Sequence, residues 1–197
     1  RVWLAKLENP RQARCSNTLW PGEGVGWPDS EAFLIDFPED IISVHALGDV
    51  VLFASRGAWY TLTGEGPNYM GIGTFGPPVR LAAVCGPIWH GGCCEVAGGL
   101  IYQGVNGELY KIDRQTLEVT KLTDQTRSWV WKRATDYSTG GVKALVVGAT
   151  TNPTKRYAYL QMRPSTLGTY LNSSLVVYDD ETQQLYLDTG ACAHDTY

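Results

Sequence analysis

The chain has 197 residues, of which 44% are hydrophobic and 18% are charged, and its formal net charge is −4. This hydrophobic content is sufficient for a buried core, but there is no basic stripe of the kind that tight nucleic-acid binding requires. No apolar run approaches the roughly 20 residues of a membrane-spanning helix. The 22 glycines, 7 tryptophans and 11 tyrosines are typical of a protein built from turns and aromatic strand faces.

The two ends of the sequence and its cysteines add two expectations. Arg1 already lies in a predicted strand and the chain stops abruptly after Ala193–Tyr197, so we expect a fragment of a longer protein. An odd number of irregularly spaced cysteines indicates free thiols in a reducing compartment rather than a disulfide framework. The cysteines are Cys15, Cys85, Cys93, Cys94 and Cys192.

Short apolar segments recur along the whole chain, separated by turns rich in glycine, proline, asparagine and serine. Residues 9–26 and 64–78 are two long predicted loops. Residues 124–139 are the one candidate helix, although Trp129 and Trp131 alternate as in a strand. In chain order, strands are expected at 1–7, 32–37, 41–47, 50–54, 58–63, 79–84, 93–96, 100–102, 109–112, 119–122, 142–148, 156–162, 174–178 and 185–188.

Segment 98–123 predicts three strands joined by two tight turns, the first marked by the hairpin signal Asn106-Gly107. Segment 48–63 aligns with its front without gaps at an offset of 50, and segment 172–189 aligns with its back at an offset of 66. Repetition of small sheets predicts an all-β, β-propeller-like array of small antiparallel sheets. We expect one such domain over residues 1–197, with blade-like repeats near 41–63, 95–123 and 157–189.

The repeats also predict turn geometry. Gly57 and Gly107 occupy equivalent turn positions, so both are expected to have positive φ. Asp113-x-x-Thr116 and Asp179-x-x-Thr182 recur in register, as turn-capping groups do and catalytic groups rarely do. We therefore expect these aspartates to be structural.

No motif predicts an active site, so the chain is not expected to be an enzyme. A zinc site needs about four ligands at paired spacings. Here Cys93 and Cys94, close to His90, are adjacent and are expected to point to opposite faces of a strand. No metal and no cofactor are therefore expected. There is no G-x-S-x-G box, and Gly71-x-Gly73 lacks the rest of a dinucleotide fingerprint. The tryptophans and carboxylates leave one alternative open, a carbohydrate-binding or glycan-hydrolysing propeller.

Residues 98–116 resemble a quinoprotein-type or kelch-like blade, although the tryptophan expected after the turn is replaced by Val119. A quinone-dependent dehydrogenase is thus a third and least favoured reading. A more specific series resembles the tail nozzle proteins (tail tubular protein B type, head-to-tail joining) of short-tailed bacteriophages. That series is Arg1–Ala5, Trp27-Pro28, Ile41–Ser55, Tyr60–Gly64 with Pro67, Cys85 and Leu100–Leu109.

The resemblance implies a structural virion protein, a tail nozzle subunit that forms part of the DNA-ejection channel. It implies a homohexamer in contact with the tail adaptor and other virion tail proteins, located in the virion tail and assembled in the host cytoplasm. DNA would pass without sequence-specific binding, which suits the mildly acidic balance. Loops as long as 9–26 and 64–78 usually have a function, so Trp20, Trp27 and Tyr69 are expected at subunit contacts.

Overall fold

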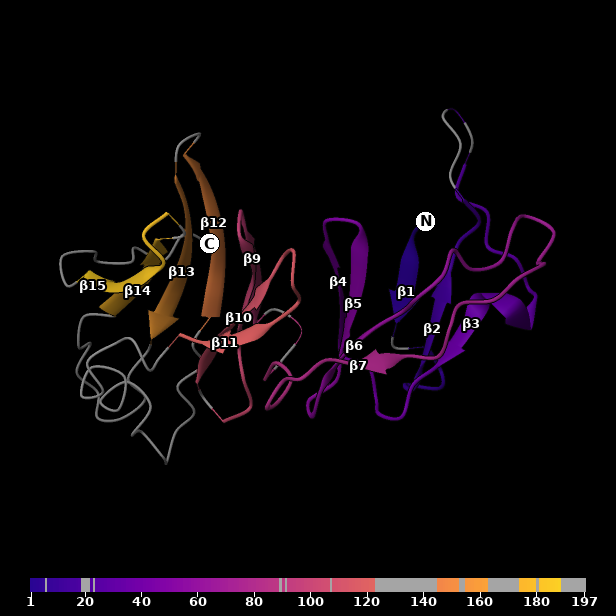
Figure 1. Cartoon of the computed structure of the whole chain (residues 1–197), viewed down its shortest axis with the longest axis horizontal. Helices are drawn as coiled ribbons and strands as arrows, with labels where there is room; N and C mark the ends of the chain where they lie inside the picture. Colours follow the sequence, from indigo (N-terminus) through magenta and orange to yellow (C-terminus); the bar gives the residue numbers. More distant parts are fainter. Residues whose placement is uncertain are drawn as a thin grey trace. The chain divides into compact units, whose positions relative to one another are not determined.

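The computed structural model describes residues 1–5, 7–18, 22, 24–88, 90, 92–106, 108–122, 145–152, 155–162, 174–179 and 181–188. Within these residues the regular elements are β-strands and one 3₁₀ turn. The strands form four small antiparallel sheets, which confirms the expected all-β array (Figure 1). The chain divides into two compact units, Arg1–His90 and Gly91–Tyr197, and each contains two of the sheets.

The first sheet of the first unit has three strands, β1 (Trp3–Ala5), β2 (Gln12–Cys15) and β3 (Leu34–Asp36), in the order β1-β2-β3. Strand β2 lies inside the segment 9–26 that the sequence predicted to be loop, so that prediction was wrong. The strand has only four residues and directly follows a turn. Its period-2 alternation, with Ala13 and Cys15 buried, is too short to be recognised by pattern.

The strand predicted over residues 32–37 is shorter than expected, because its first part is helical. Glu31–Phe33 forms a 3₁₀ turn, and the Ser30 side chain accepts a hydrogen bond from the backbone N–H of Ala32. A serine in an extended conformation ahead of a helical turn is a preferred N-cap. The chain enters β3 only after this turn ends.

The second sheet of this unit has the order β4-β5-β6-β7. Its strands are β4 (Ser43–Leu47), β5 (Val50–Ala54), β6 (Trp59–Thr61) and β7 (Val79–Arg80). The strand expected over 79–84 is thus only two residues long, and it pairs with β6 at the edge of the sheet.

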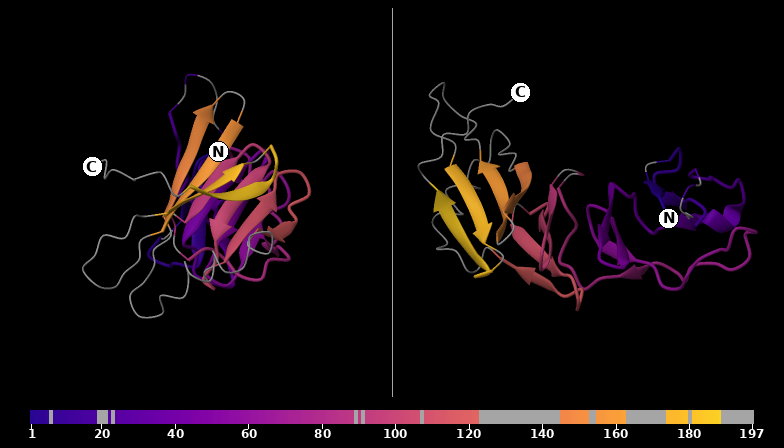
Figure 2. Two further views of the ribbon diagram at one scale, coloured as in Figure 1. Left: turned by 90° about the vertical axis from the view of Figure 1, so that its left-hand side faces the viewer. Right: turned by 90° about the horizontal axis from the view of Figure 1, so that it is seen from above.

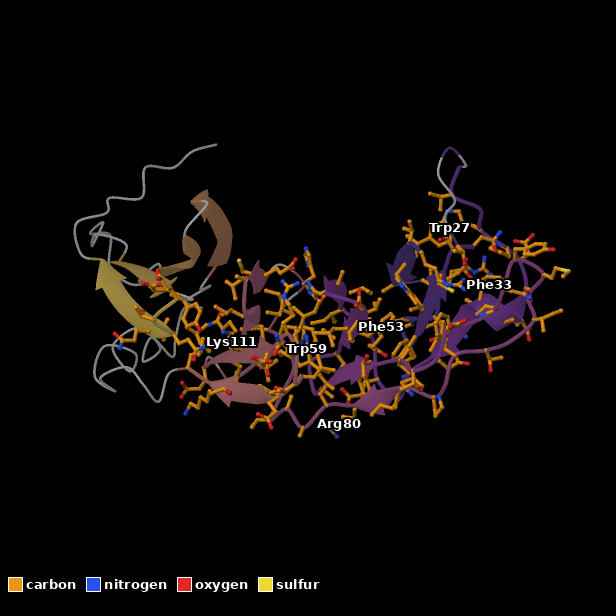
Figure 3. The ribbon with its side chains drawn as sticks, turned by 45° about the horizontal axis from the view of Figure 1, so that its top comes forward. Trp27, Phe33, Phe53, Trp59, Arg80 and Lys111 are labelled. Atoms are coloured by element: carbon orange, nitrogen blue, oxygen red, sulfur yellow. The ribbon has the colours of Figure 1, made fainter. Side chains whose placement is uncertain are left out.

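Phe53 on β5 is at the centre of the core of the first unit (Figure 3). Its ring lies 5.0 Å from that of Trp3 on β1 in an edge-to-face arrangement, and 4.8 Å from that of Phe37. Such aromatic pairs contribute beyond the area they bury. Phe53 therefore fastens the three-stranded sheet to the four-stranded one.

The first sheet of the second unit has the order β11-β10-β9-β8. Tyr102 and Tyr110 are cross-strand partners whose rings stack at 5.3 Å, and the predicted Asn106 turn joins the two strands that carry them. The Asn106 Nδ2 donates to the Tyr110 hydroxyl at 2.7 Å. The strands are β8 (Cys93–Val96), β9 (Gly99–Gln103), β10 (Leu109–Asp113) and β11 (Val119–Lys121).

The last sheet pairs consecutive strands in the order β12-β13-β14-β15 (Figure 2). Within the second unit, the Lys111 ammonium on β10 donates to the Tyr178 hydroxyl on β14 at 3.2 Å and lies 5.5 Å from the centre of its ring. This buried pair links the two sheets of the unit. The strands are β12 (Leu145–Asn152), β13 (Lys155–Met162), β14 (Ser174–Asp179) and β15 (Gln184–Asp188).

The gapless alignment of segment 48–63 on segment 98–113 needs a correction of one residue. Leu47 pairs with Val50 as Val96 pairs with Gly99, so β4 and β5 match β8 and β9 at an offset of 49. Strand β6 matches β10 at an offset of 50, because Leu52–Thr61 corresponds to Ile101–Lys111. The loop between β9 and β10 therefore contains one residue more than the loop between β5 and β6. A shift of one residue in the pairing would exchange the two faces of a strand. The extra loop residue takes up the one-residue difference, so the strand pairing is the same in both sheets.

The alignment at an offset of 66 holds in every detail that the structure describes. Ile112 pairs with Val119 as Tyr178 pairs with Leu185. The Asp113 carboxylate accepts the N–H groups of residues 115 and 116, and the Asp179 carboxylate accepts those of residues 181 and 182. Leu117 and Gln183 both have positive φ, 58° and 54°. The two aspartates cap the same turn, as predicted.

The expectation of positive φ at Gly57 was wrong, and Gly107 lies outside the described residues, as does the candidate helix 124–139. Gly57 does not have a left-handed backbone; instead, a Cβ atom there would lie 2.6 Å from a carboxylate oxygen of Glu39. The left-handed glycine of this sheet is Gly48, with φ 63°, at the first position of the β4–β5 turn. A two-residue turn needs glycine there when its type is II′.

Candidate functional site

A loop in the first unit exposes three apolar side chains. Tyr69, Met70 and Ile72 have exposed fractions of 72%, 64% and 66%. We call residues 68–72 the tip loop. Scattered single apolar residues on a surface are normal, whereas adjacent ones indicate an interaction site.

Asn68 closes the tip loop by hydrogen bonds from both its backbone and its side chain. Its N–H donates to the carbonyl of Ile72 at 2.8 Å, and its carbonyl accepts from Gly71 at 2.9 Å. Its side-chain oxygen accepts from the N–H groups of Met70 and Ile72 at 2.9 and 3.0 Å. Gly71 takes a φ of 78°, which glycine adopts without strain. Four backbone N–H groups of the tip loop are thus bonded within it, and its apolar side chains are exposed.

Arg1 anchors the base of the same loop. Its guanidinium donates to the carbonyl oxygens of Glu65 at 3.2 Å and Pro67 at 2.5 Å, and it lies 5.6 Å from the centre of the Phe75 ring. A second nitrogen of the guanidinium donates to the carbonyl of Ser16. Arginine suits this position because its planar fork binds several acceptors while stacking on an aromatic ring.

The three residues predicted at subunit contacts are in different situations. Tyr69 is at the tip loop and is the most exposed aromatic ring described. Trp27 is half-buried and lines a separate groove (Figure 3). Trp20 lies outside the described residues. The structure therefore does not bring Tyr69 and Trp27 into one site.

The groove beside Trp27 has a volume of about 420 Å³ and lies on the outer face of the β1–β3 sheet. We call it the Trp27 groove. Its floor includes the cross-strand row Leu4, Arg14 and Leu34, one residue from each strand. The lining residues are Leu4, Leu7, Glu8, Asn9, Gln12, Arg14, Trp27 and Leu34.

A polar cluster around Glu39 fixes the β5–β6 hairpin. The Ser55 hydroxyl donates to the Glu39 carboxylate at 2.6 Å, and the Tyr60 hydroxyl donates to it at 3.1 Å. The bond from Ser55 lowers the pKa of Glu39 below its usual range despite partial burial. Burial, followed by the adjacent Glu39 charge, raises the pKa of Tyr60. Because Ser55 Oγ also accepts the N–H of Ala58, this cluster is a hairpin clamp.

Ser43 and His45 are the described pair that most resembles a nucleophile and its base. The His45 Nε2 lies 3.0 Å from the Ser43 hydroxyl, and the two residues are two apart on β4, so they share one face. Catalysis by such a pair also needs a site that binds substrate and stabilises an oxyanion. Neither the Trp27 groove nor the groove at Thr182–Leu185 includes these residues.

Among the described cysteines, Cys15, Cys85, Cys93 and Cys94 form no disulfide. Burial raises the pKa of Cys93, and burial together with the Glu95 charge raises the pKa of Cys94 to about 11. A thiol of high pKa is a poor nucleophile and a poor metal ligand. Among the described residues, no three histidine, cysteine or acidic side chains come close enough together to hold a metal ion.

Sequence reasoning named Tyr69 as a contact candidate but did not name its exposed neighbours Met70 and Ile72 or the supporting Arg1. The signal for Met70 and Ile72 was present: two apolar residues beside an aromatic one in a glycine-rich loop, where no strand buries them. Arg1 carried no signal, because its acceptors in the loop are two backbone carbonyls more than 60 residues away.

Comparison of the chain with protein-family models finds no match, and comparison with curated proteins finds none. No helix among the described elements has the length and apolar character needed to cross a membrane.

Proposed function

We propose that this chain is a structural virion protein, a tail nozzle subunit of a short-tailed bacteriophage that forms part of the DNA-ejection channel. The tip loop is the observation that carries the proposal. It exposes Tyr69, Met70 and Ile72 on a backbone already held by Asn68 and Arg1. A preorganised loop loses little conformational entropy on association, and aromatic residues and methionine are enriched at protein interfaces. The tip loop is therefore the subunit contact.

Two further features support this role. The chain is built from small antiparallel sheets, and the first unit has an aromatic core around Phe53, as expected of a structural subunit. A net charge of −4 gives DNA little electrostatic attraction. The proposed assembly is a homohexamer in the virion tail, in contact with the tail adaptor and formed in the host cytoplasm. It performs no catalysis and holds no cofactor.

The test replaces the apolar side chains of the tip loop by serine. We expect the triple variant Tyr69→Ser, Met70→Ser, Ile72→Ser to keep its far-ultraviolet circular dichroism, because these side chains are exposed in the single chain. We expect its assembly to weaken by at least about tenfold, because truncating a central aromatic contact usually costs that much or more. Analytical ultracentrifugation and negative-stain imaging measure the assembly.

Val84 provides the matched control, since it is 77% exposed but lies outside the tip loop. Val84→Ser should assemble like the unmodified chain. Full assembly of the triple variant would reject the tip loop as the contact. Loss of binding on a glycan array with assembly intact would instead favour the carbohydrate-binding alternative.

A further inference from the structure

Met70 carries an accessible thioether in the middle of the tip loop. The chain has 2 methionines, and Met70 is 64% exposed. Its N–H donates to the side-chain oxygen of Asn68 at 2.9 Å, and the next residue, Gly71, has a φ of 78°. The backbone at Met70 is therefore fixed by local bonds while its side chain is open to small solutes. Peroxide converts such a thioether to the sulfoxide.

The surroundings of Met70 suit a thioether and not a sulfoxide. Its exposed neighbours Tyr69 and Ile72 complete an apolar patch, and segment 66–78 contains no charged residue. Oxidation would place a polar acceptor oxygen in this patch. Four of the five backbone N–H groups of the tip loop already donate to acceptors inside it. The sulfoxide oxygen therefore takes its hydrogen bonds from water, which a protein contact would exclude.

The reaction is a two-electron oxidation with hydrogen peroxide as the oxidant. A lone pair of the Met70 sulfur attacks one peroxide oxygen, so that an S–O bond forms and the O–O bond breaks. The other oxygen leaves as water after it takes up a proton. The thiols of Cys93 and Cys94 compete poorly, because burial raises their pKa and the thiolate is the reactive form. Two thiols of an external dithiol can reverse the step through a sulfoxide reductase, giving a disulfide and water.

We propose that Met70 is a modification site at which oxidation by hydrogen peroxide to the sulfoxide weakens the contact made by the tip loop. This inference rests on the proposed function, because it takes the tip loop to be the subunit contact. A polar group that becomes buried without a hydrogen-bond partner opposes association. The sulfoxide therefore favours the free subunit, and reduction of the sulfoxide restores assembly. In turn, the assembled contact covers the thioether and slows its oxidation.

The experiment treats the full chain with hydrogen peroxide and measures oxidation and assembly separately. Peptide mass spectrometry should show one added oxygen atom on Met70, formed faster in dilute subunits than in assembled particles. Sedimentation velocity should show assembly weakened by at least about fivefold, the smallest change expected when one buried polar group is left without a partner. Treatment with the two stereospecific methionine sulfoxide reductases and dithiothreitol should restore assembly.

Met70→Leu is the matched control, because leucine keeps the patch apolar and has no sulfur; peroxide should not change the assembly of this variant, which retains every cysteine. Met162→Leu should respond to peroxide as the unmodified chain does. Unchanged assembly of a chain oxidised at Met70, or a response that persists in Met70→Leu, would overturn this inference alone. Full assembly of the triple serine variant would reject the contact itself, and this inference with it.

Discussion

Glu39 is a residue whose ionisation is coupled to the stability of the first unit. Its carboxylate accepts hydrogen bonds from Ser55 and Tyr60, and the bond from Ser55 lowers its pKa. Because the folded pKa lies below the unfolded one, the stabilisation is fully present above the unfolded pKa. It is lost as the pH falls through the folded pKa.

We expect Glu39→Gln to lower the free energy of unfolding by about 1 kcal/mol at neutral pH, because a charge-assisted hydrogen bond becomes a neutral one. Below the folded pKa of Glu39 the two proteins should become equally stable. Urea denaturation from pH 7 to pH 3 measures this convergence. Asp40→Asn is the control for loss of a nearby carboxylate, since the Arg11–Asp40 pair is exposed and contributes little. A constant difference at every pH would contradict the assignment.

At the scale of the elements, Gly99 shows how closely neighbouring strands approach. It opens β9 opposite Asp113 on β10, and a Cβ atom at this position would overlap the backbone carbonyl of Ile112. Backbone, unlike the end of a flexible side chain, cannot move aside without disturbing the strand pairing. We therefore expect Gly99→Ala to destabilise the second unit by about 1–3 kcal/mol.

Denaturant midpoints of Gly99→Ala and of a glycine control measure this effect. Gly24 is the control, because a Cβ atom there would meet no other atom within 4 Å and its φ is not positive. Gly24→Ala should be close to neutral. If both variants unfolded at the same denaturant concentration, the close approach of β9 and β10 would be refuted.

The elements of this fold were largely predictable, and their boundaries were not. Hairpins such as Val50–Ala54 with Trp59–Thr61 have apolar runs on both sides of a turn signal, and the sequence places them correctly. Strand β2 and the 3₁₀ turn before β3 were missed because each is four residues or shorter. At this length the pattern is weaker than the nearby turn residues, and contacts with other strands decide the conformation. The one-residue insertion between repeats was equally invisible, since both alignments match similar residues.

At the scale of the whole molecule, each unit has its own two sheets, so the loss of one core should remain local. We expect Phe53→Ala to destabilise the first unit by roughly 3–5 kcal/mol, because it removes a fully buried ring between Trp3 and Phe37. Hydrogen-exchange mass spectrometry should then show lost protection in residues 1–90 and retained protection in β8–β11. Uniform loss across both units would show instead that they unfold as one.

Only part of the candidate sites could be predicted from the sequence. The physical reason for this differs from one feature to another. Tyr69 was expected at a subunit contact because it lies in a long predicted loop, and long loops usually have a function. An aromatic residue in such a loop can be recognised from the sequence. The burial of the Arg14 Nε could not be predicted, since an arginine in an alternating segment normally faces water. It depends on a sheet whose three strands come from separate segments of the chain.

The shared turn of the β10–β11 and β14–β15 hairpins has a consequence for how such a chain can grow. Two segments 66 residues apart have the same register, the same aspartate cap and a left-handed residue at the same position, Leu117 in one and Gln183 in the other. Because each hairpin encodes its own turn, it can be duplicated or exchanged without any change in the turn. Only the side chains that contact neighbouring sheets have to change. The divergence between the two copies should therefore concentrate in the side chains that face adjacent sheets, while the corner itself stays constant.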